Sequence, residues 1–184
     1  MELKIGLWNG WIFMSVFILQ MFVMMVADQN AQQRTHIPLE ARLNQRERCV
    51  SLIANLVWLA ALIYSVFLPL RLNTNWFAPG LAAFILGLIC LGAATWSFMT
   101  APSGAPITNG IYRFSRHPMY LATFLISLGT GMATASWLFI LLSVVMAGCF
   151  RQEALIEERI CLVQYGEAYR AYRERVPRWL GVPK

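Results

Sequence analysis

A short polar block that contains a histidine interrupts the apolar C-terminal half of the chain. It covers residues 109–120, and its His117 stands beside Arg116 where the following residues become apolar. Ionisable groups at the edge of such a segment are costly, so they more often mark a site than packing. A second polar cluster, residues 153–158, follows the last apolar run. We expect the two clusters to meet at one face of a helical bundle.

Each polar residue of these clusters also has a structural explanation, which the sequence leaves open. His117 could cap a helix or contact a phosphate headgroup, and Arg116 could be an ordinary arginine at the end of a span. Tyr112 and Tyr120 could belong to an interfacial aromatic belt. The adjacent glutamates of the second cluster could lie on a solvated helix face. The functional interpretation therefore depends on their combination.

The loop before Pro118 has the composition of an irregular segment. Residues 99–118 contain several prolines and glycines, which favour turns. Pro118 suits the first turn of the next helix, because its missing N–H would be unpaired there in any case. The free N–H groups of that turn form the positive end of a helix dipole. Such a loop beside a helix start is well suited to hold a polar cofactor.

The composition places these clusters in a membrane protein. Hydrophobic residues make up 58% of the 184 residues and charged residues 13%, with a mean hydropathy of +0.55. Soluble domains typically carry about 25% charged residues. Apolar segments over residues 7–27, 50–70 and 76–98 each approach the ~20 residues that cross a bilayer core. They predict three N-terminal spans within residues 1–98.

The fourth apolar run, residues 119–150, is too long for one span and short for two. Gly129, Gly131 and the small residues up to Ser136 interrupt it near its middle, which favours a tight helical hairpin. A re-entrant hairpin is the alternative. The sequence thus predicts one all-α integral membrane domain, residues 1–184, with about five transmembrane helices.

The tail beyond the last apolar run predicts a C-terminal cytoplasmic amphipathic helix. Its Ile156, Ile160 and Val163 recur at i, i+4 and i+7. Gly166 is expected to end or kink this helix, and Pro177 stops the pattern. The polar segment 28–49 is expected to be a solvated connector; a short interfacial helix over Leu39–Cys49 is the alternative.

Basic residues indicate the orientation. Thirteen of the fifteen Lys and Arg lie in residues 28–49, in residues 99–118 or beyond residue 150, which leaves Lys4 and Arg71. The positive-inside rule then places the N-terminus outside and the tail in the cytoplasm, in a plasma or inner membrane. The net charge of +6 fits a face near anionic headgroups. No basic run alternates with aromatics, so no nucleic-acid partner is expected.

Two other classes of feature are not indicated. The apolar run near the N-terminus exceeds the usual length in a secretory signal, so we do not expect cleavage. The four cysteines are scattered without a C-x-x-C pair, and the two histidines lie far apart. Neither a metal site nor a disulfide framework is therefore expected.

The order of four sequence blocks is similar to a known superfamily. The blocks are Gly110-x-Tyr112-x-x-x-Arg116-His-Pro-x-Tyr120, Glu157-Glu158-Arg159, Tyr165-Gly166-x-x-Tyr169-x-x-Tyr172 and Val176-Pro177-Arg178. Together, over roughly residues 95–180, they resemble the membrane methyltransferase superfamily, which includes isoprenylcysteine carboxyl methyltransferases and phospholipid N-methyltransferases. The resemblance implies S-adenosyl-L-methionine as the cofactor. It would bind at the cytoplasmic face, between the last two membrane helices and the tail, in a catalytic region over residues 99–184.

The resemblance also implies individual roles. His117 and Tyr120 would contact the methionine end of the cofactor, with backbone groups of the intervening residues nearby. Glu157 would bind a cofactor hydroxyl or amino group, and Glu158 would support it. The cofactor-binding residues implied in this way are Ile107, Tyr112, His117, Pro118, Met119, Tyr120, Glu157 and Glu158. Gly129 and Gly131 match a Gly-x-Gly of the phospholipid branch, although a hairpin turn explains them equally well.

One departure from the family pattern concerns the methyl acceptor, for which Arg116 and Glu153 are the residues expected beside the reacting groups. In the isoprenylcysteine enzymes an arginine lies four residues before the equivalent of Glu157, and here that position is Glu153. A carboxylate there would repel an anionic acceptor and favour a lipid amine. A register shift that brings Arg151 into the role would instead suit carboxyl O-methylation.

Two other functions remain open at this level. A sterol-reductase-like enzyme would share the helical layout and bind NADPH. A non-catalytic membrane protein that uses the fold for binding or assembly would tolerate changes at His117 and Glu157. The sequence does not define the oligomeric state.

Overall fold

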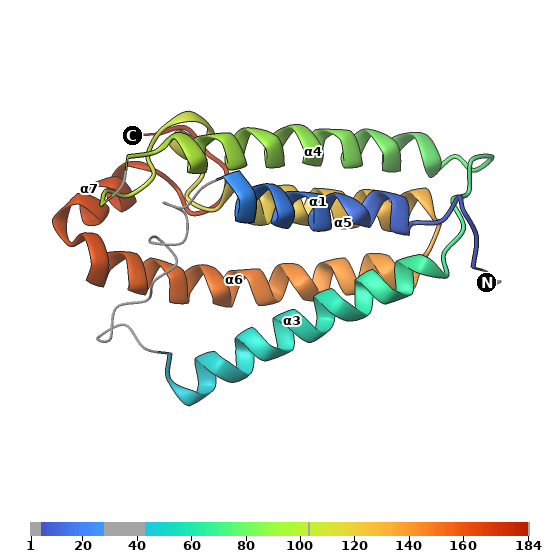
Figure 1. Cartoon of the computed structure of the whole chain (residues 1–184), viewed down its shortest axis with the longest axis horizontal. Coiled ribbons are helices and arrows are strands. Elements are labelled where there is room, and N and C mark those ends of the chain that lie inside the picture. The colour runs from blue at the N-terminus through green and yellow to red at the C-terminus, as the bar shows by residue number, and fades with distance from the viewer. Residues whose placement is uncertain (1–4, 28–42, 103, 184) are drawn as a thin grey trace.

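The computed structural model describes residues 5–27, 43–102 and 104–183, and its regular secondary structure there is entirely helical. The elements are α1 (Trp11–Ala27), α3 (Gln45–Val66), α4 (Phe77–Thr100), the 3-10 helix η2 (Gly110–Arg113), α5 (Pro118–Ala133), α6 (Trp137–Tyr165) and α7 (Glu167–Arg175). In Figure 1, α1, α4, α5 and α6 run roughly parallel to one another and α3 diverges from them.

Local sequence explains where several helices begin and end. Asn44 and Glu47 form a reciprocal capping box at the start of α3. Pro118 occupies the first turn of α5 as expected, and the Ser136 side chain accepts from the backbone N–H of Phe139 at the start of α6. Gly166, at a φ of +53°, ends α6 in a conformation that glycine adopts most readily.

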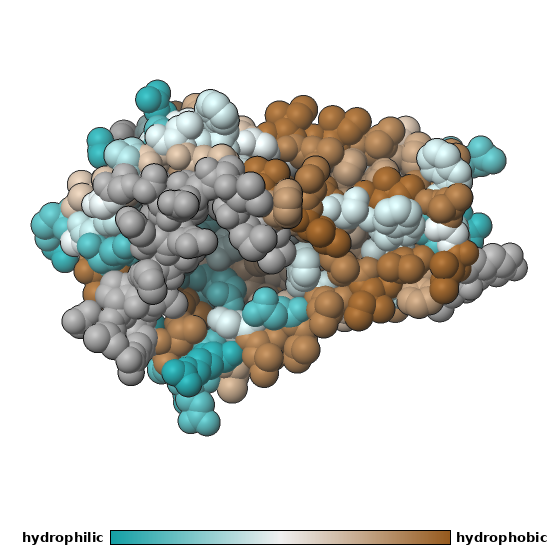
Figure 2. All heavy atoms as spheres, viewed as in Figure 1, coloured by the Kyte–Doolittle hydropathy of each residue, from teal (hydrophilic) through white to brown (hydrophobic). Residues whose placement is uncertain are grey.

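Three of these helices, α3, α4 and α6, are long and apolar enough to cross a membrane. The first part of α1 (Trp11–Gln20) and the whole of α5 are shorter apolar segments. Only 11% of the apolar window of α3 is buried within the protein, so its hydrophobic side chains face outward. Figure 2 shows hydrophobic side chains along the middle of the bundle and hydrophilic ones mainly at its ends. This is the surface of a multi-pass membrane protein.

The predicted hairpin is present, but its turn lies later than the glycines. The chain turns at residues 134–136, where Ala135 has a φ of +49°, and Gly129 and Gly131 are buried inside α5. A Cβ on Gly129 would lie 2.6 Å from both the Gly80 carbonyl oxygen and the Phe84 nitrogen of α4. These glycines therefore permit close helix packing.

The tail also differs from the expectation of a separate amphipathic helix. The last predicted span and the first part of the tail form one 29-residue helix, α6, which ends at Gly166, and α7 follows. The alternative helix over Leu39–Cys49 lies largely outside the described residues, and its last part begins α3. His36 and Lys4 also lie outside the described residues.

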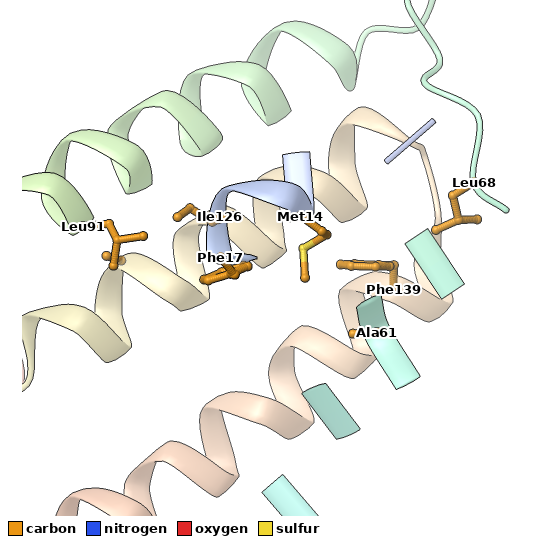
Figure 3. Close-up of a cluster of buried hydrophobic side chains, with 8 residues drawn as sticks. Met14, Phe17, Ala61, Leu68, Leu91, Ile126 and Phe139 are labelled. Atoms are coloured by element: carbon orange, nitrogen blue, oxygen red, sulfur yellow. The ribbon is translucent and has the colours of Figure 1, made fainter. Parts of the chain in front are cut away.

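The apolar core extends through the bundle from the end that is opposite the polar block. Met14, Phe17, Leu68, Ile126 and Phe139 converge there from α1, α5, α6 and the loop after α3 (Figure 3). At that end the backbone N–H of Gly10 donates to Leu68 O at 2.8 Å. The opposite end holds α7, the C-terminus and the loop between α4 and α5 (Figure 1). The two polar clusters, one before α5 and one on α6, therefore lie at the same end of the bundle, which we call the site end.

Candidate functional site

His117 lies at the centre of the site end and is the residue immediately before α5. It is 5% exposed, and its backbone N–H donates to the Ser115 hydroxyl at 3.1 Å. Its ring does not cap the helix. The structure therefore does not support the helix-capping explanation for the His117 side chain.

Both nitrogens of the His117 ring face carboxylates of α6. Nδ1 lies 3.2 Å from Glu157 Oε2, and Nε2 lies 3.3 Å from Glu158 Oε1. Burial by itself would lower the pKa of His117, but the hydrogen bonds to Glu157 and Glu158 outweigh burial and raise the pKa above its ordinary 6.5. When the ring is protonated, it can donate a hydrogen bond to a carboxylate on each side.

Glu158 is the anionic centre of this network. Its side chain is 4% exposed, and its Oε1 also accepts from Arg116 Nη2 at 2.9 Å and from Arg178 Nε at 2.8 Å. Arg178 Nη2 reaches the other oxygen at 3.0 Å. A buried carboxylate needs such partners to remain charged. The Glu157 side chain, in contrast, is 53% exposed, so this carboxylate forms the solvent-facing side of the network.

Three aromatic rings continue the site along α5 and α6. The rings of His117 and Tyr120 stack with centroids 5.4 Å apart and planes within 4°. Tyr120 in turn stacks on Phe150 at 4.9 Å and 5°. This stack leads from the polar centre into the apolar part of the bundle.

A cavity of about 290 Å³ opens beside His117. Its wall combines few polar groups with many aromatic and aliphatic ones, the usual composition of a small-molecule pocket. Burial raises the pKa of Tyr112, Tyr169 and Tyr172 well above the ordinary value, so these phenols stay neutral. The lining residues are Phe98, Pro106, Ile107, Tyr112, Arg116, His117, Glu157, Ile160, Cys161, Gln164, Tyr165, Tyr169 and Tyr172.

Most of the residues singled out from the sequence come together here. Five of them line the cavity, and Tyr120 and Glu158 contact His117. Pro118 is buried at the start of α5, and Met119 packs against the hydrophobic core. Glu153 lies one turn before Glu157 on α6, with a buried Oε1 that has no hydrogen-bond partner among the described residues. The five lining residues are Ile107, Tyr112, Arg116, His117 and Glu157.

Gly129 and Gly131 are not brought to this site. About twelve residues of α5 separate Gly129 from His117, which corresponds to about 18 Å along the helix. A Cβ on Gly131 would lie 2.8 Å from Cγ1 of Ile140 in α6. Both glycines serve helix packing, so the hairpin-turn explanation of these two glycines was also wrong.

The sequence assigned no role to several residues of the site. Phe98 gave no signal, because apolar residues in apolar helices look alike, and Ile160 stood out only through the amphipathic pattern of the tail. Tyr165, Tyr169 and Tyr172 had helical spacing as a signal, and the Tyr172 hydroxyl donates to Tyr112 O at 2.7 Å. Ser115 and Arg178 also belong to the network, and a pattern search could find only Arg178, through its place in the last block.

The chain is similar to several known proteins. A model of the phospholipid methyltransferase family matches residues 74–168. The protein-S-isoprenylcysteine O-methyltransferase of Schizosaccharomyces pombe is 32% identical over 114 residues, which cover 53% of this chain and 48% of that protein. The proteins of the same name from Dictyostelium discoideum and Mus musculus are 32% identical over 88 residues and 28% identical over 138 residues. These matches cover 42% and 67% of this chain, and 32% and 48% of the two relatives.

The chain spans about half the length, or less, of these curated relatives. The family match, however, runs from the loop before α4 to the start of α7 and covers just over half of the chain. It includes His117, Glu157 and Glu158. The chain belongs to the phospholipid methyltransferase family, within the membrane methyltransferase superfamily.

Proposed function

We propose that the chain is an integral membrane methyltransferase that uses S-adenosyl-L-methionine to methylate a hydrophobic acceptor at the cytoplasmic face. The observation that carries this proposal is the cavity at the site end. There His117, held between two carboxylates, meets an aromatic wall beside membrane helices.

The residues present fit the proposed cofactor. S-adenosylmethionine would supply an activated methyl group on a sulfonium, and it carries a carboxylate, an amine, ribose hydroxyls and an adenine. Arg116 and His117 offer positive charge, Glu157 offers a half-exposed carboxylate, and the tyrosines offer apolar faces. One cavity therefore contains both signs of charge and a slot for a flat ring.

The chain's own residues would act by binding, orientation and exclusion of water. Methyl transfer is an in-line displacement, which benefits mainly from alignment of the reactants in a dry site. His117 is bound on both ring nitrogens and has a raised pKa. It is thus suited to orient a ligand through hydrogen bonds. Tyr112, Tyr169 and Tyr172 close the buried side of the cavity.

Glu153 supports a lipid amine as the acceptor. Its Oε1 is buried without a hydrogen-bond partner among the described residues, whereas Arg151 is exposed on the same helix. A carboxylate oxygen of this kind could bind the ammonium form of the amine and take its proton, which would leave the neutral amine with the lone pair that methyl transfer needs. It would disfavour an acceptor carboxylate at the same position.

A second candidate acceptor is a prenylcysteine carboxylate. The names of the three curated relatives favour it. In that case a different residue from Glu153 would have to bind the acceptor carboxylate, and Arg116 is the cation already in the cavity wall.

A radiolabelled methyl-transfer assay distinguishes the acceptors. Purified protein in nanodiscs would receive labelled S-adenosylmethionine with either phosphatidylethanolamine or a farnesylcysteine analogue. Label in the phospholipid that decreases in Glu153→Gln, but not in the exposed control Glu174→Gln, is the expected result. Label only in the farnesylcysteine analogue would contradict the amine proposal. Label in neither compound would contradict both candidate acceptors, the lipid amine and the prenylcysteine carboxylate.

The proposed orientation has its own test. Reporter fusions or impermeant thiol labelling should place the tail, after Tyr165, on the cytoplasmic side and the N-terminus on the other. A tail that is labelled from outside intact cells would contradict this topology.

A further inference from the structure

The last residues of the chain fold back over the polar block. We call Val176–Gly181 the C-terminal strap. The backbone N–H of Arg116 donates to Pro177 O at 3.1 Å, and that of Gly181 donates to Phe114 O at 3.1 Å. These contacts join segments about sixty residues apart in sequence. The strap is therefore anchored along the segment that leads into His117.

Arg178 is the one residue of the strap that reaches the buried carboxylate. Its guanidinium binds both oxygens of Glu158, at 2.8 and 3.0 Å. Two parallel bonds of this kind fix the plane of a carboxylate as well as its position. The Arg178 carbonyl also accepts from the Ser115 hydroxyl at 3.2 Å, and that hydroxyl in turn accepts from the His117 backbone N–H. Arg178 thus contacts both of the groups that hold His117 in place.

We propose that Arg178 is a positioning residue of the cofactor site, which through Glu158 fixes the place and the charge of His117. Arg178 does not itself line the cavity, so it acts only through its neighbours. The inference rests on the proposed function in so far as the cavity is taken to hold the methyl donor. The coupling between Arg178 and His117 is a property of the protein without any ligand.

The direction of the coupling follows from the charges that face His117. Glu157 and Glu158 face it from α6, Arg116 precedes it, Tyr120 stacks on it from α5, and Arg178 reaches its neighbourhood from the strap. Arg178 Nε and His117 Nε2 share one Glu158 oxygen, so they lie at most about 6 Å apart. Two cations at this distance compete for one carboxylate. Removal of the guanidinium should therefore raise the pKa of His117.

The chain allows a direct measurement of this effect. It has only two histidines, so a His36→Gln background leaves His117 as the single imidazole signal in a nitrogen-15 NMR titration. Arg178→Met should raise the His117 pKa by about one unit. Arg170→Met is the matched control, because Arg170 forms an exposed pair with Glu167 away from the site. It should leave the titration unchanged.

A conservative variant and a binding measurement complete the test. Arg178→Lys keeps the positive charge but loses the paired hydrogen bonds of the guanidinium, so the His117 pKa should lie close to the wild-type value. This variant keeps the test available if Arg178→Met folds poorly. Affinity for S-adenosylmethionine should fall about tenfold in Arg178→Met. The proposal would be overturned if the His117 pKa in Arg178→Met and in Arg178→Lys equalled the value in the control Arg170→Met. It would also be overturned if Arg178→Met bound S-adenosylmethionine with the affinity of the wild type.

The two levels of the account can fail separately. The titration needs no cofactor, so it tests the coupling even if the wild-type protein binds no methyl donor. Absence of binding to wild-type protein with a normal coupling would contradict the proposed function alone.

Discussion

His117 Nδ1 and Glu157 Oε2 lie 3.2 Å apart, and this contact joins the start of α5 to α6 across forty residues of sequence. Glu157 is also the more exposed of the two carboxylates on the ring. A ligand that enters from the water side would therefore meet Glu157 first and find the imidazole behind it. The contact defines the mouth of the proposed cofactor site.

The first prediction concerns pH. The His117 pKa is raised in the folded protein, because the two glutamates outweigh the effect of burial. Its contribution to the free energy of unfolding is thus fully present below the ordinary pKa of 6.5 and is lost as the pH rises through the raised folded-state pKa. The difference in stability between wild type and His117→Gln should shrink over that range in thermal unfolding scans. A difference that grows with pH would contradict the assignment.

The second prediction concerns the packing glycines of α5. Gly129→Ala should destabilise the protein by about 1–3 kcal/mol, because the neighbouring atoms are backbone atoms of α4 and cannot move aside easily. Gly148→Ala in α6 is the control, since a Cβ there meets nothing within 4 Å. Affinity of the folded fraction for S-adenosylmethionine should be unchanged in both. A specific loss of affinity in Gly129→Ala at normal stability would return this glycine to the cofactor site.

The third prediction concerns the link between α3 and α6. Arg159 binds both oxygens of Glu47, at 3.2 and 2.7 Å, with side chains 39% and 17% exposed. A double-mutant cycle with Glu47→Gln and Arg159→Gln should give a coupling of only about 0.5–1 kcal/mol, because water screens the exposed arginine. Glutamine also retains a capping-box side chain at position 47. High salt should reduce the coupling further; a salt-independent coupling of several kcal/mol would contradict this.

The membrane fold could be predicted largely from composition, because apolar length alone marks α3, α4 and α6. The boundary between the last span and the tail could not. The switch to polar residues after Phe150 marks the end of the apolar surface. The helix itself continues to Tyr165 and ends at Gly166, where the backbone takes a conformation that glycine adopts readily. The glycines of α5 show the same limit. A glycine that ends a helix and one that lets two helices meet are the same residue type, and only the packing around each one distinguishes them.

The polar centre of the site was accessible from sequence for a different reason. His117, Glu157 and Glu158 are unusual residues at the edge of apolar segments, so their types alone drew attention. Tertiary structure was needed to show that Glu158 is buried and that Arg178 returns to it from the strap. Phe98 could not be identified, because its contribution is only a position on the cavity wall.

The most direct test of the central claim is calorimetric binding of S-adenosylmethionine to the detergent-purified protein, with NADPH titrated separately. The account predicts saturable binding of the methyl donor, weakened about 10- to 100-fold in His117→Ala and in Glu157→Ala because each removes a charged hydrogen-bonding group. Glu167→Ala, an exposed change on α7, should bind as the wild type does. NADPH binding would point to a reductase. No binding of the methyl donor to well-folded wild-type protein would contradict the proposed function.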